Sequence, residues 1–209
     1  MIDGDVEKRT VWAKVLQSRG EMGYPYIFFT DNANNGAADV YKDKNLPIYA
    51  SNLCTEIMLP SDHNWSFVCV LSSINVLHYD KWKDTDAVET MIYFLDAVIT
   101  EFLEKLEVYK NSDDLDDQQT FLFMERAYNF SKENRALGMG VLGWHSLLQS
   151  KMLPFDSQGA FDLNSEVFKN IKEHSNKASR DLAEKFGEPE LLKGYGRRNT
   201  TLNAVAPTT

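Results

Sequence analysis

The sequence is poor in the residues that build metal sites and disulfide frameworks. Its 209 residues include two cysteines, Cys54 and Cys69, and four histidines that are scattered along the chain. Metal ligands are normally grouped at short spacings, so we expect no metal site. Two cysteines are also too few for the disulfide framework of a small secreted domain. We therefore expect thiols that are reduced, reactive or redox-cycling.

The sequence also lacks long apolar runs and an excess of positive charge. No apolar stretch approaches the roughly 20 residues needed to cross a bilayer, and the first nine residues are too charged for a secretory signal. The net charge of −9 disfavours nucleic-acid binding, which needs a basic surface to offset the phosphates. We expect a cytoplasmic protein (in the host cytoplasm if it is virus-encoded), with neither membrane nor nucleic acid among its partners.

Segments of helical and strand-like pattern alternate along the chain. Apolar residues at helical spacing predict helices over residues 6–20, 86–109, 116–134, 144–152 and 161–186. Asp86 and Glu89 resemble a capping box at the start of the second of these. Strands are predicted over 24–29 and 200–206, and residues 31–45 are predicted to form a loop. This alternation indicates the α/β class, and 209 residues can bury one sizeable core.

Three glycines, Gly138, Gly140 and Gly143, match the Gly-x-Gly-x-x-Gly spacing of dinucleotide-binding proteins. The spacing is weak evidence without a preceding strand and a surrounding βαβ unit, and neither is evident here. We favour close packing of helices, in which glycines let two backbones approach. Similarly, Arg197 and Arg198 could approach a phosphate, but adjacent arginines more often form a solvated loop.

The most distinctive stretch places Cys54 between an amide, Asn52, and a carboxylate, Glu56. On an extended chain, residues two apart point to the same side. The amide, the thiol and the carboxylate would then project together as a compact reaction centre. The alternate residues would face away and anchor the segment; they are Leu53, Thr55 and Ile57.

The second cysteine can return to the neighbourhood of the first. Residues 59–64 are rich in turn-forming types, and Cys69 follows in the apolar run 67–71. Taken singly, a free cysteine often packs as a small hydrophobe. Considered without its neighbours, Cys69 is better explained by such packing. For Cys54, considered in the same way, packing and a functional role are equally good explanations.

The string Ser-Asn-Leu-Cys-Thr-Glu-Ile at 51–57, followed by Cys-Val-Leu-Ser-Ser-Ile-Asn at 69–75, resembles the finger loop and next strand of the class I ribonucleotide reductase large subunit. Residues 23–27, 135–143 and 206–209 agree with the same family. The resemblance implies that residues 1–209 are part of a catalytic domain, a segment of a ten-stranded α/β barrel with the cysteine loop at its centre. It places the finger loop at about 50–60, helical segments at about 86–134 and 144–187, and the start of a phosphate loop at 206–209.

The resemblance also implies roles for individual residues. Cys54 would form a thiyl radical, Glu56 would act as a base, and Asn52 would hydrogen-bond the substrate's hydroxyls. Cys69 would be one member of a redox-active pair whose partner lies outside this chain. The other substrate-binding residues implied are Ser51, Leu53, Pro207, Thr208 and Thr209.

The implied partners all lie outside these 209 residues, and no cofactor is expected within the chain. They are complementary large-subunit fragments, a metal-containing small subunit that generates the radical, a ribonucleoside diphosphate substrate, thioredoxin or glutaredoxin as reductant, and ATP or deoxynucleotide effectors on other regions. One alternative is a non-catalytic remnant that only packs or binds partners. Another is a cobalamin-dependent reductase, which usually has a different string around the finger cysteine.

Overall fold

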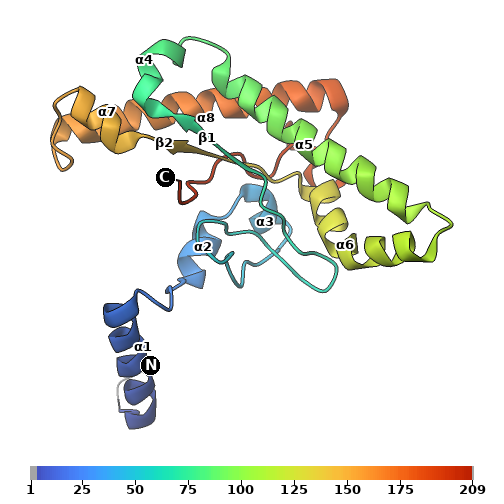
Figure 1. Cartoon of the computed structure of the whole chain (residues 1–209), viewed down its shortest axis with the longest axis horizontal. Coiled ribbons are helices and arrows are strands. Elements are labelled where there is room, and N and C mark those ends of the chain that lie inside the picture. Colours follow the sequence, from blue (N-terminus) through green and yellow to red (C-terminus); the bar gives the residue numbers. More distant parts are fainter. Residues whose placement is uncertain (1–3, 209) are drawn as a thin grey trace.

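The structure, a computed structural model, describes residues 4–208, and these residues are mostly helical around a small parallel sheet (Figure 1). Its elements are α1 (Val6–Met22), α2 (Thr30–Gly36), α3 (Asp39–Asp43), β1 (Leu71–Asn75), α4 (Tyr79–Trp82), α5 (Ala87–Lys110), α6 (Leu115–Asn134), β2 (Gly138–Leu142), α7 (Trp144–Ser150) and α8 (Gln158–Phe186), with 3₁₀ turns at Val76–His78 and Glu190–Leu192. No helix within 4–208 is long and apolar enough to cross a membrane.

The sheet is the centre of the architecture. β1 and β2 pair in parallel, with Leu71 opposite Gly138. The C-terminal segment runs along the other side of β2, where the Met139 N–H donates to the Leu202 carbonyl at 2.8 Å and a parallel bridge joins Met139 to Asn203. The strand predicted over 200–206 is thus present only as this single bridge with its flanking hydrogen bonds. The three parallel segments are linked by helical crossovers, which parallel pairing requires.

The glycines of the Gly-x-Gly-x-x-Gly spacing lie in and after a strand, so the prediction of helix packing is wrong. A Cβ on Gly140 would collide with the carbonyl oxygen of Ala204, and a Cβ on Gly138 would collide with the side chain of Leu71. Close backbone approach is therefore the reason for these glycines, but between neighbouring strands. Gly143 has a φ of 78°, which glycine adopts without steric cost, and it caps the start of α7.

The long helices confirm the predictions from periodicity, with ends shifted by up to three residues. The predicted strand over 24–29 is wrong, because this segment is irregular, and the predicted loop over 31–45 contains α2 and α3. The strand that the resemblance implies at 69–75 corresponds to β1, which begins at Leu71, opposite the start of β2, so Cys69 precedes it. At the start of α5, Asp86 makes no side-chain cap, and Glu89 bonds His174 of α8 instead.

Two apolar cores cover the two faces of the sheet. The first joins the sheet to α5, α7 and α8, and Ile92, Met139 and Val167 lie at its centre. The second lies on the side of α3 and the segment before β1; its buried members are Val40, Tyr41, Ile57, Leu59, Phe130, Ala136, Leu191 and Leu192. α1 stands away from both, as Figure 1 shows, and each of its residues is exposed or half-buried.

A buried ionic cluster ties the helices to the C-terminal segment. Asp96 of α5 accepts hydrogen bonds from Arg135 at 2.8 Å, Arg198 at 3.0 Å and Asn199 at 3.0 Å. Arg198 also donates to the Gly187 carbonyl at the end of α8, so the prediction of a solvated arginine loop is wrong. Burial acts to raise the pKa of Asp96, but the bonds and charges of the two arginines outweigh it and lower the pKa.

We predict that Asp96→Ala lowers the free energy of unfolding by about 3–5 kcal/mol, the usual cost of leaving buried charges without a counter-ion. Arg135 and Arg198 would both lose their carboxylate partner. Urea unfolding of the full chain measures the loss. Glu101→Ala is the matched control on α5, because its ion pair with Lys105 is exposed and its removal should change little.

The pH dependence of stability provides a second test of the Asp96 ion pairs. Because the folded pKa of Asp96 is below its ordinary value of 3.8, its contribution is complete above that pH and is lost as the pH falls through the folded pKa. The stability difference between wild type and Asp96→Ala should therefore shrink below about pH 4. A difference independent of pH down to pH 2 would contradict this account.

Candidate active site

The segment around Cys54 forms a tight turn, so the prediction that it is extended is wrong. The Asn52 N–H donates to the Ile57 carbonyl at 3.3 Å, and the Thr55 N–H donates to the Asn52 carbonyl at 3.2 Å. Thr55 has a φ of 64°, in the left-handed region. The alternation expected of a strand is therefore lost, and Leu53 is 89% exposed rather than an anchor.

The side chain of Asn52 closes this turn. Its Oδ1 accepts hydrogen bonds from the Glu56 N–H at 3.1 Å and the Ile57 N–H at 3.0 Å. Ser51 donates its hydroxyl to the Asn52 carbonyl at 3.0 Å. Cys54 is exposed at the tip, while Ile57 and Leu59 are buried in the second core and anchor the C-terminal side of the loop.

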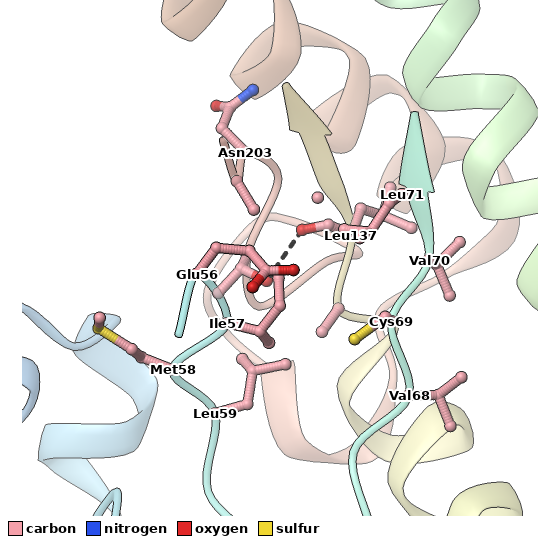
Figure 2. A pocket seen from close by; sticks show the side chains of 14 residues that line it. Glu56, Ile57, Met58, Leu59, Val68, Cys69, Val70, Leu71, Leu137 and Asn203 are labelled. Atoms are coloured by element: carbon pink, nitrogen blue, oxygen red, sulfur yellow. Dashed lines mark hydrogen bonds between the residues drawn. The ribbon is translucent and has the colours of Figure 1, made fainter. Parts of the chain in front are cut away.

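A cavity of about 150 Å³ lies between this loop and the segment that leads into β1. Figure 2 shows the side chains of Glu56 and Cys69 reaching from the two segments toward the space between them. The Oε2 atom of Glu56 is buried and has no hydrogen-bond partner among residues 4–208. The remaining walls come from residues 57–59, 68, 70–71, 136–138, 201 and 203–204.

The pKa of the Cys69 thiol is shifted by its burial and by the charges of Glu56 and Cys54. Both cysteines are free thiols in the described chain, and both are exposed. Partial burial raises the pKa of Cys69, and the charges of Glu56 and Cys54 raise it further. Glu56 and Cys69 line the same cavity, whereas Cys54 lies at the exposed tip of the loop. The raised pKa favours the protonated thiol at Cys69.

The C-terminal residues lie against β1. The hydroxyls of Ser73 and Thr208 are 3.2 Å apart, and Thr208 donates to the Ala206 carbonyl at 3.0 Å. Ser73 is then the donor in the first bond, because Thr208 has one hydroxyl proton. Pro207 and Thr208 are exposed, and Thr209 lies outside the described residues. The structure thus brings 207–208 to the sheet that also carries the cavity.

Sequence reasoning missed several residues of this site. Thr201 and Asn203 line the cavity, and Ser73 holds Thr208. The predicted strand over 200–206 was the available signal for the first two. Residues 136–138, which also line the cavity, carry no comparable signal, because the glycine spacing that includes Gly138 predicts helix packing rather than a strand.

Comparison with known families identifies the class. The model of the ribonucleotide reductase barrel domain matches residues 2–198, so the chain belongs to the ribonucleotide reductase barrel-domain family. A solved class Id ribonucleotide reductase alpha subunit from Actinobacillus ureae superposes with a TM-score of 0.88 at 56% identity, covering 98% of this chain.

Viral proteins are similar as well. The ribonucleoside-diphosphate reductase large subunit of Invertebrate iridescent virus 3 is 33% identical over 97% of the chain, and that of Invertebrate iridescent virus 6 is 37% identical over 74%. The matches span 30% and 15% of these two proteins and 37% of the bacterial subunit. The chain therefore corresponds to part of the barrel domain of a class I large subunit, as the resemblance implied.

We predict that Glu56→Gln lowers the pKa of the Cys69 thiol, because a negative charge that opposes thiolate formation is removed. The pKa should stay above its ordinary value of 9.0, since burial, the larger cause, remains. The measurement is the pH dependence of Cys69 alkylation by iodoacetamide, made in a Cys54→Ser background to follow one thiol.

Glu173→Gln is the control, because it removes a carboxylate from the exposed side of α8. It should leave the alkylation profile of Cys69 unchanged. An unchanged or raised pKa in Glu56→Gln would show that the carboxylate does not act on this thiol.

Proposed function

We propose that this chain supplies the catalytic part of a ribonucleoside-diphosphate reductase large subunit. The reaction converts a ribonucleoside diphosphate and two thiols into the 2′-deoxyribonucleotide, water and a disulfide, and serves DNA synthesis. One observation carries the proposal: Glu56, whose buried Oε2 has no hydrogen-bond partner within residues 4–208, and the Cys69 thiol border the same cavity, and the loop that carries Glu56 also carries the exposed Cys54. Family membership supports the reaction class.

Cys54 is proposed to start the reaction as a thiyl radical. Loss of the 2′-hydroxyl has no easy ionic route, whereas a radical at the neighbouring 3′ carbon makes it possible. The weak S–H bond allows Cys54 to form a radical that takes the 3′ hydrogen atom and returns it at the end. Its exposed position at the tip of the loop is compatible with access to a substrate.

Glu56 is proposed to accept the proton of the 3′-hydroxyl, which pushes electrons toward the departing 2′-hydroxyl. Its buried Oε2 has its hydrogen-bonding capacity available, since no partner for it lies within residues 4–208. Asn52 is proposed to hydrogen-bond the ribose hydroxyls. Ser51 and Leu53 would contribute the adjacent wall of the substrate site.

Cys69 is proposed to supply one of the two reducing thiols. A second cysteine, outside this chain, would supply the other, and the pair would close to a disulfide as the sugar is reduced by two electrons. Cys54 cannot be that second cysteine, because an oxidised Cys54 could not form the thiyl radical. The preference of Cys69 for its protonated form suits a thiol that delivers hydrogen.

The substrate's phosphates are proposed to bind at Pro207, Thr208 and Thr209. Hydroxyls and backbone amides suit phosphate oxygens, and Thr208 is exposed next to β1. The radical would come from a metal-containing small subunit, and thioredoxin or glutaredoxin would reduce the disulfide back to two thiols. Complementary large-subunit fragments would carry the ATP and deoxynucleotide effector sites, and the assembly would work in the cytoplasm.

We predict that Cys54→Ser abolishes deoxynucleotide formation by the assembled enzyme while nucleotide binding stays nearly intact. Serine has almost the same size, but its O–H bond is too strong to yield a usable radical. Product formation and nucleotide affinity are measured side by side. Appreciable turnover by the serine variant would rule out the thiyl role, and a wild-type assembly without turnover would favour the non-catalytic alternative.

We also predict that one turnover without external reductant joins Cys69 to a cysteine outside this chain. Alkylation of the remaining thiols followed by peptide mapping identifies the disulfide. A turnover-dependent disulfide between Cys54 and Cys69 would contradict the proposed roles of the two residues.

A further inference from the structure

We propose that Asn52 is a positioning residue whose side-chain oxygen holds the finger loop in its turn and so places Cys54. The importance of that placement for catalysis rests on the proposed function, but the structural role does not. The inference starts from a contrast within the chain: regular strand pairing begins only at Leu71, so the loop at 51–57 is not held by the sheet.

Instead, the hydrogen bonds that hold the backbone of the loop converge on a single residue, Asn52. Both the Glu56 and Ile57 N–H groups donate to Asn52 Oδ1, and both backbone groups of Asn52 bond across the turn, to Ile57 and to Thr55. Asparagine is well suited to this, because its short side chain reaches nearby backbone amides. Alanine at this position would keep the two backbone bonds and lose the two side-chain bonds.

Thr55 makes the side-chain bonds necessary. A φ of 64° is uncommon for any residue except glycine and costs more for a β-branched one. Such a conformation persists only where the surroundings impose it. Here the Asn52 backbone carbonyl holds the Thr55 N–H, and the Asn52 side chain holds the next N–H along the chain. Cys54 therefore sits next to a strained residue that Asn52 restrains on both sides.

The geometry also fixes which atom of Asn52 remains for a substrate. The atom facing two N–H donors must be the oxygen, and two bonds use both of its lone pairs. Only the Nδ2 group is left, and it can donate but not accept. Asn52 would then donate to a hydroxyl oxygen of the ribose, which leaves the hydroxyl proton directed elsewhere, toward a base such as Glu56.

The test compares Asn52→Ala with Asn52→Asp by residue-resolved amide hydrogen exchange on the full chain. Alanine removes the acceptor, so exchange at Glu56 and Ile57 should quicken by roughly fivefold or more, in line with the loss of one hydrogen bond at each amide. Aspartate keeps an acceptor at the same place, so both amides should exchange at close to the wild-type rate. Core amides of Val167 and Ile171 on α8 report whether each variant folds.

Asn34→Ala is a matched control, because Asn34 of α2 uses its Oδ1 to accept from the Ile48 N–H at 2.8 Å, outside the finger loop. It should quicken exchange at Ile48 and leave Glu56 and Ile57 unchanged. Unchanged exchange at Glu56 and Ile57 in Asn52→Ala would overturn the proposal, and so would equally fast exchange in Asn52→Asp. Since no turnover is measured, these outcomes are independent of whether Cys54 forms a radical.

Discussion

The buried carboxylate of Asp96 is the constraint on which the arrangement of the chain depends. Its side chain is only 4% exposed, and it meets Arg135 at the end of α6 and both Arg198 and Asn199 of the C-terminal segment. Asn199 in turn accepts a hydrogen bond from the Ser179 hydroxyl of α8, which links α8 to the same cluster. The single charge of Asp96 therefore joins α5 to the end of α6, to the C-terminal segment and, through Asn199, to α8. The cost of burying this charge is offset because all of these hydrogen bonds are made.

That cluster sets the position of the cavity walls. The residues that follow it, 136–138 and 201–204, run in parallel beside each other, and both segments contribute side chains to the cavity wall. The glycines of β2 let these backbones come close enough to pair, since a Cβ at Gly140 would meet the Ala204 carbonyl. The finger loop lies against these segments but is held by its own short-range hydrogen bonds and by Ile57 and Leu59 in the second core. The segments and the loop are thus stabilised by different means.

The sequence could predict the long helices because amphipathic periodicity depends on local spacing, and the ends of α5, α6 and α8 fall within three residues of the prediction. It could select Cys54, Glu56 and Cys69 through their resemblance to a family. It could not predict the turn at Thr55, since nothing local distinguishes a left-handed threonine from a strand residue. The start of β1 at Leu71 and the partner of Arg198 were equally beyond reach, because both depend on residues far away in the chain.

The two cysteines differ because Cys54 lies on the hydrogen-bonded loop, whereas Cys69 lies next to the sheet and lines the cavity. Cys54 projects from a loop tip, where the backbone conformation decides its direction. Cys69 precedes the sheet, beside the carboxylate of Glu56, and there burial and charge decide its protonation. A radical site needs accurate placement more than a particular charge state, whereas a reducing thiol needs its proton. The local turn and the cavity electrostatics therefore match the separate tasks proposed for the two thiols.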